Sequence, residues 1–133
     1  MEECWASGLI NQTTWQLWQL FEDRNSLDTS EIRREMGVTR KKGGSRVDAS
    51  IRELQRTYYI TVAGNRRKVD RHGQPYGWPS VIYEIVTSWA PADWLSGISK
   101  IHPAEAREKI LDTGMAMGKH SSRKELADLL GIN

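Results

Sequence analysis

The chain has 133 residues, of which 38% are hydrophobic and 27% charged, which is room for one ordinary domain or a compact domain with an extension. Its single cysteine, Cys4, excludes an intramolecular disulfide framework, and the lack of an apolar run of about 18 residues excludes a membrane-spanning helix. The net charge of +2 favours no class of partner, and without a signal-peptide pattern we expect a cytoplasmic protein.

The first predicted helix runs from Gln12 to Arg24, where Trp15, Trp18 and Phe21 recur at helical spacing and give a broad apolar stripe. A second, shorter helix is predicted from Asp28, because Glu31 follows three residues later as in a capping box. Leu27 and Ile32 flank the cap at the positions of a hydrophobic staple. Gly37 is expected to end this helix in a left-handed conformation.

A third helix is predicted to begin near Ser45, after a loop over residues 38–44. Val47, Ile51 and Leu54 lie at helical spacing and form one narrow apolar face. Two strands are predicted over residues 58–62 and 81–86, from their β-branched and aromatic content. We expect the chain to turn at Gly64-Asn65 and to continue as a long polar loop through Gly77.

This order of elements predicts an α+β, mainly α fold: a winged helix-turn-helix of three helices and a two-stranded wing. The predicted domain covers residues 8–90. Residues 91–133 form a C-terminal helical extension that we expect to pack on it. Within the extension, one helix is expected to begin at Pro103, and Ser122 with Glu125 predicts a capping box for a last helix closed by Gly131.

Basic residues are concentrated in the middle of the chain. Residues 40–71 contain ten basic and three acidic residues, which leaves +7, whereas the rest has nine basic and fourteen acidic residues, or −5. A basic segment between acidic flanks is typical of a surface that meets phosphate.

The candidate DNA-binding residues lie on the third helix, in the loop before it and in the predicted wing. Arginine suits bidentate contacts to guanine, and cations at a wing neutralise phosphates. The alternatives are a solvated helix face and a merely mobile loop. The candidates are Lys41, Lys42, Arg46, Ser50, Arg52, Arg56, Arg66, Arg67, Lys68 and Arg71.

The sequence offers little for other chemistry. His72, His102 and His120 show no metal-ligand spacing, and the Gly-Gly-Ser after Lys41-Lys42 does not have the spacing of a P-loop. We therefore expect no catalytic residue, metal, cofactor or small-molecule substrate. The six tryptophans are predicted to lie mainly in the core, with base stacking as the alternative.

Several phrases carry a family resemblance, at residues 54–64, 66–68, 76–80, 89–91 and 103–108. On these phrases the chain, from about Gly8 onward, resembles the bacterial AlkZ-related winged-helix proteins, relatives of the AlkZ/YcaQ-type DNA glycosylases. The resemblance implies a tandem winged-helix architecture and a link to DNA repair or DNA binding. The glycosylases carry a Gln-x-Gln or Gln-x-Asp catalytic motif, whereas Gln16 and Gln19 here have the wrong spacing.

Three functions therefore stay open. The first is a module of a repair-associated or regulatory protein that binds double-stranded DNA through the third helix and the wing. The second is a protein–protein or dimerisation module without DNA contact, which exposed tryptophans would favour. The third is a glycosylase-like activity on alkylated bases, which rests on the resemblance alone.

Overall fold

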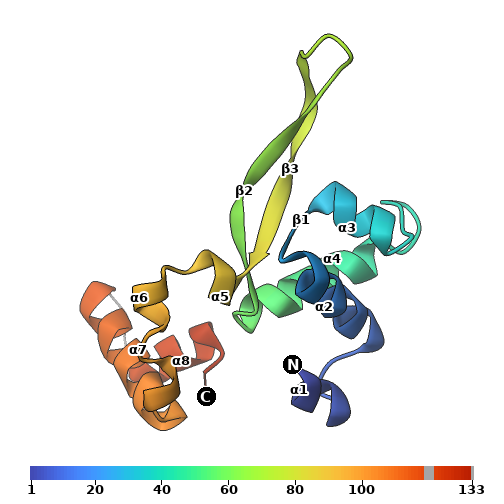
Figure 1. Cartoon of the computed structure of the whole chain (residues 1–133). Coiled ribbons are helices and arrows are strands. Elements are labelled where there is room, and N and C mark those ends of the chain that lie inside the picture. The colour runs from blue at the N-terminus through green and yellow to red at the C-terminus, as the bar shows by residue number, and fades with distance from the viewer. Residues whose placement is uncertain (119–121, 133) are drawn as a thin grey trace. The chain divides into compact units, whose positions relative to one another are not determined.

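The computed structural model describes residues 1–118 and 122–132, and the chain divides into two compact units, Met1–Pro91 and Ala92–Asn133 (Figure 1). The fold is mixed α/β with one three-stranded antiparallel sheet. Among the described residues, no helix combines the length and the apolar character needed to cross a membrane.

The three helices predicted for the first unit are present, and two short helices that were not predicted are added to them, α1 (Glu2–Ala6) and α5 (Val86–Trp89). The side chain of Asn11 accepts a hydrogen bond from the Thr14 N–H at the start of its helix, and Asp28 forms the predicted capping box with Glu31. Gly37 has φ +63°, and the N–H of the residue after it bonds back to Arg33, which completes a Schellman ending. The helices are α1 (Glu2–Ala6), α2 (Gln12–Arg24), α3 (Thr29–Glu35), α4 (Gly44–Arg56) and α5 (Val86–Trp89).

The sheet has the order β1-β3-β2, with β1 at Ser26–Asp28, β2 at Ile60–Val69 and β3 at Pro75–Ile85. The prediction of a turn at Gly64-Asn65 was wrong, because both residues pair with β3. Gly64 instead follows a register shift in β2, which is a second common use of glycine in strands. The hairpin turns over residues 70–74, where the Asp70 N–H bonds to the Gln74 carbonyl.

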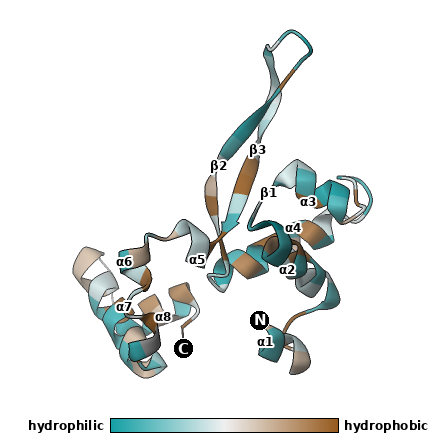
Figure 2. Ribbon diagram, in the orientation of Figure 1, coloured by the Kyte–Doolittle hydropathy of each residue, from teal (hydrophilic) through white to brown (hydrophobic). Residues whose placement is uncertain are grey.

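The core of the first unit is formed by one face each of α2, α3 and α4 and by the inner ends of β1 and β2. Strand β1 was not predicted, because three residues are too few to show a period, but its Leu27 is buried opposite Tyr83 of β3. The outer part of the hairpin extends beyond the helices and is mainly hydrophilic (Figures 1 and 2). The buried residues are Leu17, Trp18, Phe21, Leu27, Ile32, Val47, Ile51, Leu54 and Ile60.

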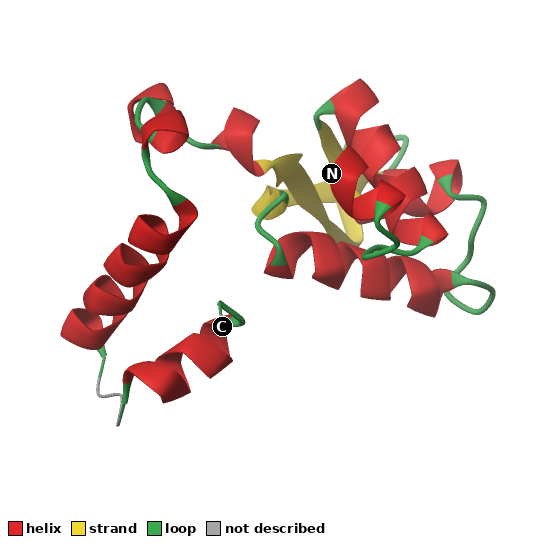
Figure 3. Cartoon of the chain, turned by 90° about the horizontal axis from the view of Figure 1, so that it is seen from below, coloured by secondary structure: helices red, strands yellow, loops and turns green. Residues whose placement is uncertain are grey.

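The second unit contains helices and, among its described residues, no strand (Figure 3). The second winged helix that the resemblance implies is therefore not formed by these residues. Arg123 bonds to Asp112 and Glu108 and joins the last two helices over a small core of Leu111, Leu126 and Ala127. The elements are α6 (Ala92–Leu95), the 3-10 helix η1 (Ile98–Lys100), α7 (Pro103–Met117) and α8 (Arg123–Leu130).

The prediction that the tryptophans lie mainly in the core was wrong. Trp18 is buried, but Trp78 is 93% exposed, and Trp89 and Trp94 are also exposed. The indole of Trp5 stacks on Trp15 with ring centroids 5.7 Å apart. The small core is filled mostly by Leu, Ile and Phe, so burial cannot explain most of the tryptophans.

Candidate nucleic-acid interface

Helix α4 separates an apolar face from a basic one. Val47, Ile51 and Leu54 are buried against the other helices, as their spacing predicts. Arg46 and Arg52 are exposed. The apolar stripe of the helix packs on the core, so the side of the helix that carries the arginines faces solvent.

The acidic residues of α4 face the neighbouring helices. Asp48 Oδ1 lies 3.1 Å from Nη2 of Arg33 on α3. Glu53 accepts a hydrogen bond of 2.5 Å from the Thr14 hydroxyl on α2 and a longer one of 3.4 Å from Asn11. Both carboxylates are therefore bonded to side chains of neighbouring elements. They form no salt bridge with the exposed arginines of their own helix.

Arg46, Arg52 and Arg56 make no salt bridge within the described part of the chain. Arg52 and Arg56 stand four residues apart on one helix, an arrangement in which like charges repel. Exposed cations without a salt bridge in the described residues are available to an external anion.

The turn before α4 adds further cations next to this face. Thr39 and Lys42 exchange two backbone hydrogen bonds of 3.0 and 3.1 Å, so Arg40 and Lys41 stand at the tip of a tight turn. A side chain at Gly44 would place its Cβ 2.8 Å from the Thr39 carbonyl oxygen. Glycine is thus required for the helix to begin this close to the basic turn.

Ser50 is the one candidate on α4 that the structure places elsewhere. It is only 1% exposed, and its hydroxyl lies 3.0 Å from that of Thr14. The expectation that Ser50 is exposed was wrong, because position 50 falls beside Val47 and Ile51 on the packed face of the helix. The Ser50 hydroxyl is a hydrogen-bond partner of the buried Thr14 hydroxyl, between α4 and α2.

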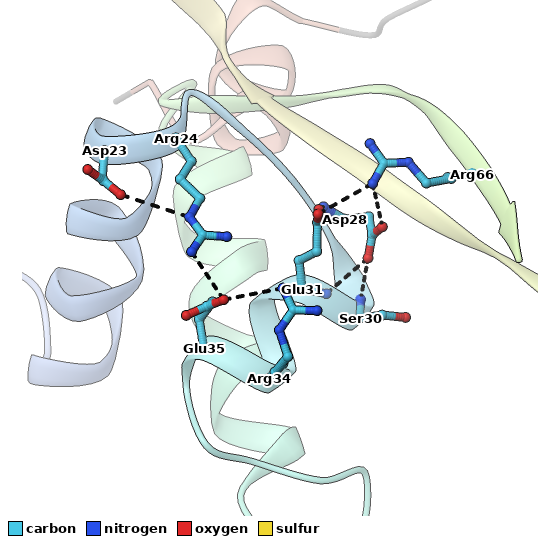
Figure 4. A network of polar contacts seen from close by, with 8 residues as sticks. All are labelled: Asp23, Arg24, Asp28, Ser30, Glu31, Arg34, Glu35 and Arg66. Carbon is cyan, nitrogen blue, oxygen red and sulfur yellow. Dashed lines mark hydrogen bonds and ion pairs between the residues drawn. The ribbon is translucent and has the colours of Figure 1, made fainter.

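Arg66 is also engaged inside the protein. Its Nη1 lies 3.2 Å from Asp28 Oδ2 and 3.4 Å from Glu31 Oε1, at the N-terminus of α3 (Figure 4). Beside it, the hydroxyls of Ser30 and Ser80 lie 2.8 Å apart. These contacts attach the middle of the hairpin to α3, so Arg66 is half-exposed but already paired with two carboxylates.

The remaining hairpin candidates lie further out. Arg67 and Lys68 are exposed on β2, without a salt bridge among the described residues, and not at the tip where a turn at Gly64-Asn65 would have put them. Arg71 does stand in the turn, where its Nε donates to Nε2 of His72 at 3.0 Å. Asp70 shapes the turn by accepting backbone N–H bonds from residues 72 and 74.

Trp78 is a further candidate residue, which was predicted to lie in the core with base stacking as the alternative. The strand register shifts between Arg66 and Lys68, where Arg67 of β2 stands opposite three residues of β3, 77–79. Trp78 is the middle residue of this bulge. Its neighbours Gly77 and Pro79 are residue types that fit a regular ladder poorly, and this pattern could have marked the position.

In residues 1–118 and 122–132, no group of three His, Cys, Asp or Glu side chains is placed to hold a metal ion, and His120 lies outside the described residues. Gln16 and Gln19 line an open hollow with Glu35. The Glu35 carboxylate lies 3.2 Å from Arg24 and 3.3 Å from Arg34, so it is held by two cations (Figure 4).

The comparisons with known proteins gave one finding. A family model described as AlkZ related matches residues 1–131, nearly the whole chain. The match begins before Gly8, where the resemblance was expected to start. Neither the curated proteins nor the solved structures gave a match.

Proposed function

The chain belongs to the AlkZ-related family, and from this premise we propose that its first unit is a winged helix-turn-helix module that binds double-stranded DNA in a repair-associated or regulatory role. In this proposal α2, α3 and α4 are the three helices, and α3 with α4 is the helix-turn-helix. The hairpin β2–β3 is the wing. Helix α4 enters the major groove, and the wing meets the neighbouring backbone.

The observation that carries the proposal is a set of three exposed arginines on α4 that make no salt bridge in the described residues. Arg46, Arg52 and Arg56 face solvent without partners in the described residues, while the acids of the same helix are paired elsewhere. These arginines do not serve packing, because exposed cations contribute little to stability and Arg52 and Arg56 repel one another. Phosphate is the anion that these arginines fit best, together with the cations of the turn before α4.

The test is fluorescence-polarisation binding of the purified chain to a mixed-sequence duplex at several salt concentrations between about 50 and 200 mM. We expect the affinity to fall steeply and linearly on a double-logarithmic plot. Replacing Arg46, Arg52 and Arg56 by Gln should reduce the slope by up to about three units. The absence of any binding at the lower salt would refute the proposal.

A matched control separates a local interface from net charge. Replacing Lys100, Lys109 and Lys124 of the second unit by Gln removes the same three charges, yet none of these residues belongs to the proposed interface. This control should keep the wild-type slope. An equal loss in both triple variants would mean that the chain attracts DNA only through its overall charge.

A second candidate function, a protein–protein or dimerisation module, is favoured by one observation in the second unit. An open hollow of about 640 Å³ lies between α7 and α8 and is lined mostly by apolar residues. Ile110, Met117 and Leu129 line it and are exposed, and exposed apolar patches mark partner sites. Sedimentation equilibrium over a range of concentrations tests it: association that Leu129→Glu abolishes would support this function, and a monomer throughout would oppose dimerisation.

A further inference from the structure

Trp78 is the most exposed large apolar side chain among the described residues, at 93%. An indole gains a large free energy from burial, and an isolated hydrophobic residue of this size on a hairpin packs against nothing. Tyr76 and Val69, which lie nearby on the outer hairpin, are also more than half exposed. This end of the hairpin therefore carries apolar surface that the fold itself does not use.

The backbone holds the indole out of the regular ladder. Residues 77–79 stand opposite the single residue Arg67, so this part of β3 forms a bulge. Gly77 has φ +68°, a left-handed conformation that a residue with a side chain rarely adopts. Pro79 has no N–H to donate to a neighbouring strand. Bulges of this kind redirect a side chain, and here the redirected side chain is Trp78.

The surroundings of Trp78 are cationic. Arg67 and Lys68 are exposed without a salt bridge in the described residues, and the Asp70 carboxylate is occupied by two backbone N–H groups of the turn. An exposed aromatic ring on the same strand pair as free cations is the combination with which proteins stack on nucleobases while they neutralise the phosphates. Charge complementarity thus favours a nucleic acid over a protein surface.

We propose that Trp78 stacks on an unpaired or unstacked base, so that the hairpin favours DNA with a local interruption of base stacking over a regular duplex. The faces of stacked bases in an intact duplex are covered by their neighbours, so an indole finds a free face only where stacking is broken. This inference rests on the proposed DNA binding and names the DNA feature that the wing recognises.

The experiment compares Trp78→Ala and Trp78→Phe with the wild-type full chain on two DNAs of the same sequence. One is fully paired, and the other has a gap of two unpaired nucleotides. Binding is measured by fluorescence polarisation at one salt concentration. We expect the wild type to favour the gapped DNA, Trp78→Ala to weaken binding to it by about 5- to 100-fold, and Trp78→Phe to keep most of the affinity.

The paired duplex should lose less than about twofold in Trp78→Ala, and the salt slope should stay the same because indole carries no charge. Trp94→Ala removes another exposed tryptophan and serves as the matched control, which should bind both DNAs like the wild type. Circular dichroism verifies that each variant is folded. Quenching of tryptophan emission by gapped DNA that is smaller in Trp78→Phe gives a second readout.

Equal losses on both DNAs in Trp78→Ala, or no loss on the gapped DNA, would overturn the inference while the proposed DNA binding stands. If the wild type binds neither DNA, both proposals fail. If Trp78→Ala leaves both affinities unchanged but abolishes self-association of the chain, Trp78 belongs to a protein interface and the inference is overturned.

Discussion

Arg66 of β2 and Asp28 at the start of α3 are joined by an ion pair of 3.2 Å, although 38 residues separate them in the chain. Asp28 uses its other oxygen, Oδ1, to accept the N–H groups of Ser30 and Glu31 at 2.7 and 3.0 Å. One nearly buried carboxylate therefore caps a helix and anchors the hairpin. This residue pair holds the proposed wing on the proposed helix-turn-helix together with the Ser30–Ser80 contact and the pairing of β1 with β3.

Arg66→Ala should lower the free energy of unfolding by about 1 kcal/mol, because Asp28 would keep its helix cap but lose a cationic partner. The exposure of Arg66 limits the effect, since water screens the pair. Urea unfolding measures it. Arg67→Ala, on the adjacent exposed residue without a salt bridge, is the control and should stay within about 0.5 kcal/mol of the wild type. Equal losses of unfolding free energy in the two variants would show that the Arg66–Asp28 ion pair does not contribute to stability.

Helices α2, α3 and α4 could be predicted from sequence because their signals are local, whereas the short helices α1 and α5 were not predicted. Apolar spacing marks α2 and α4, and α3 is marked by its capping box and by the glycine that follows it. The hairpin was predicted too short because its outer half has no buried face, so no hydrophobic alternation marks Arg67 or Lys68 as strand. Its length depends on pairing between residues far apart in sequence.

The sequence predicts where the basic residues of the candidate site are concentrated, but not which of them form ion pairs. The basic segment 40–71 is visible by counting, and most of its cations are exposed. Composition cannot show that Arg66 has two acidic partners or that Asp48 forms an ion pair with Arg33, because these contacts join separate elements. The exposure of Trp78 depends on a register shift, which also follows from long-range pairing.

Ser50→Ala should change stability and not DNA affinity. The Ser50 hydroxyl is buried 3.0 Å from that of Thr14, and losing it should lower the free energy of unfolding by about 1 kcal/mol. Duplex affinity should stay within about twofold. Ser45→Ala, on the exposed first turn of the same helix, is the control for stability. Weaker DNA binding at unchanged stability in Ser50→Ala would contradict the packed position of this residue.

Gly44→Ala should be destabilising although alanine favours helices by about 1 kcal/mol over glycine. The new Cβ would stand 2.8 Å from the backbone oxygen of Thr39, which no side-chain movement can relieve. We expect a loss of about 1–3 kcal/mol in thermal or urea unfolding. Gly64→Ala meets nothing within 4 Å and should change stability much less. A stabilised Gly44→Ala would show that the turn before α4 adapts freely.

Alkaline pH should destabilise the first unit through Tyr83. Burial, reinforced by the Asp48 carboxylate, raises the pKa of the Tyr83 phenol above its ordinary value of 10.0. The folded state thus favours the neutral phenol, so its contribution is complete below pH 10 and is lost as the pH rises through the folded pKa. Tyr83→Phe should flatten the decline of unfolding free energy in urea titrations above pH 10. Identical pH profiles would contradict this role.

Arg66 of the hairpin is paired with carboxylates and its neighbours Arg67 and Lys68 are not, so we expect their replacement to affect DNA binding unequally. Arg67 and Lys68 have no salt bridge in the described residues, so replacing both by Gln should lower the salt slope by up to about two units. Arg66→Gln should leave the slope nearly unchanged, because Asp28 and Glu31 already neutralise this guanidinium. Fluorescence polarisation with a paired duplex measures both. If Arg66→Gln lowers the slope by a full unit, the ion pair opens on binding and Arg66 itself contacts phosphate.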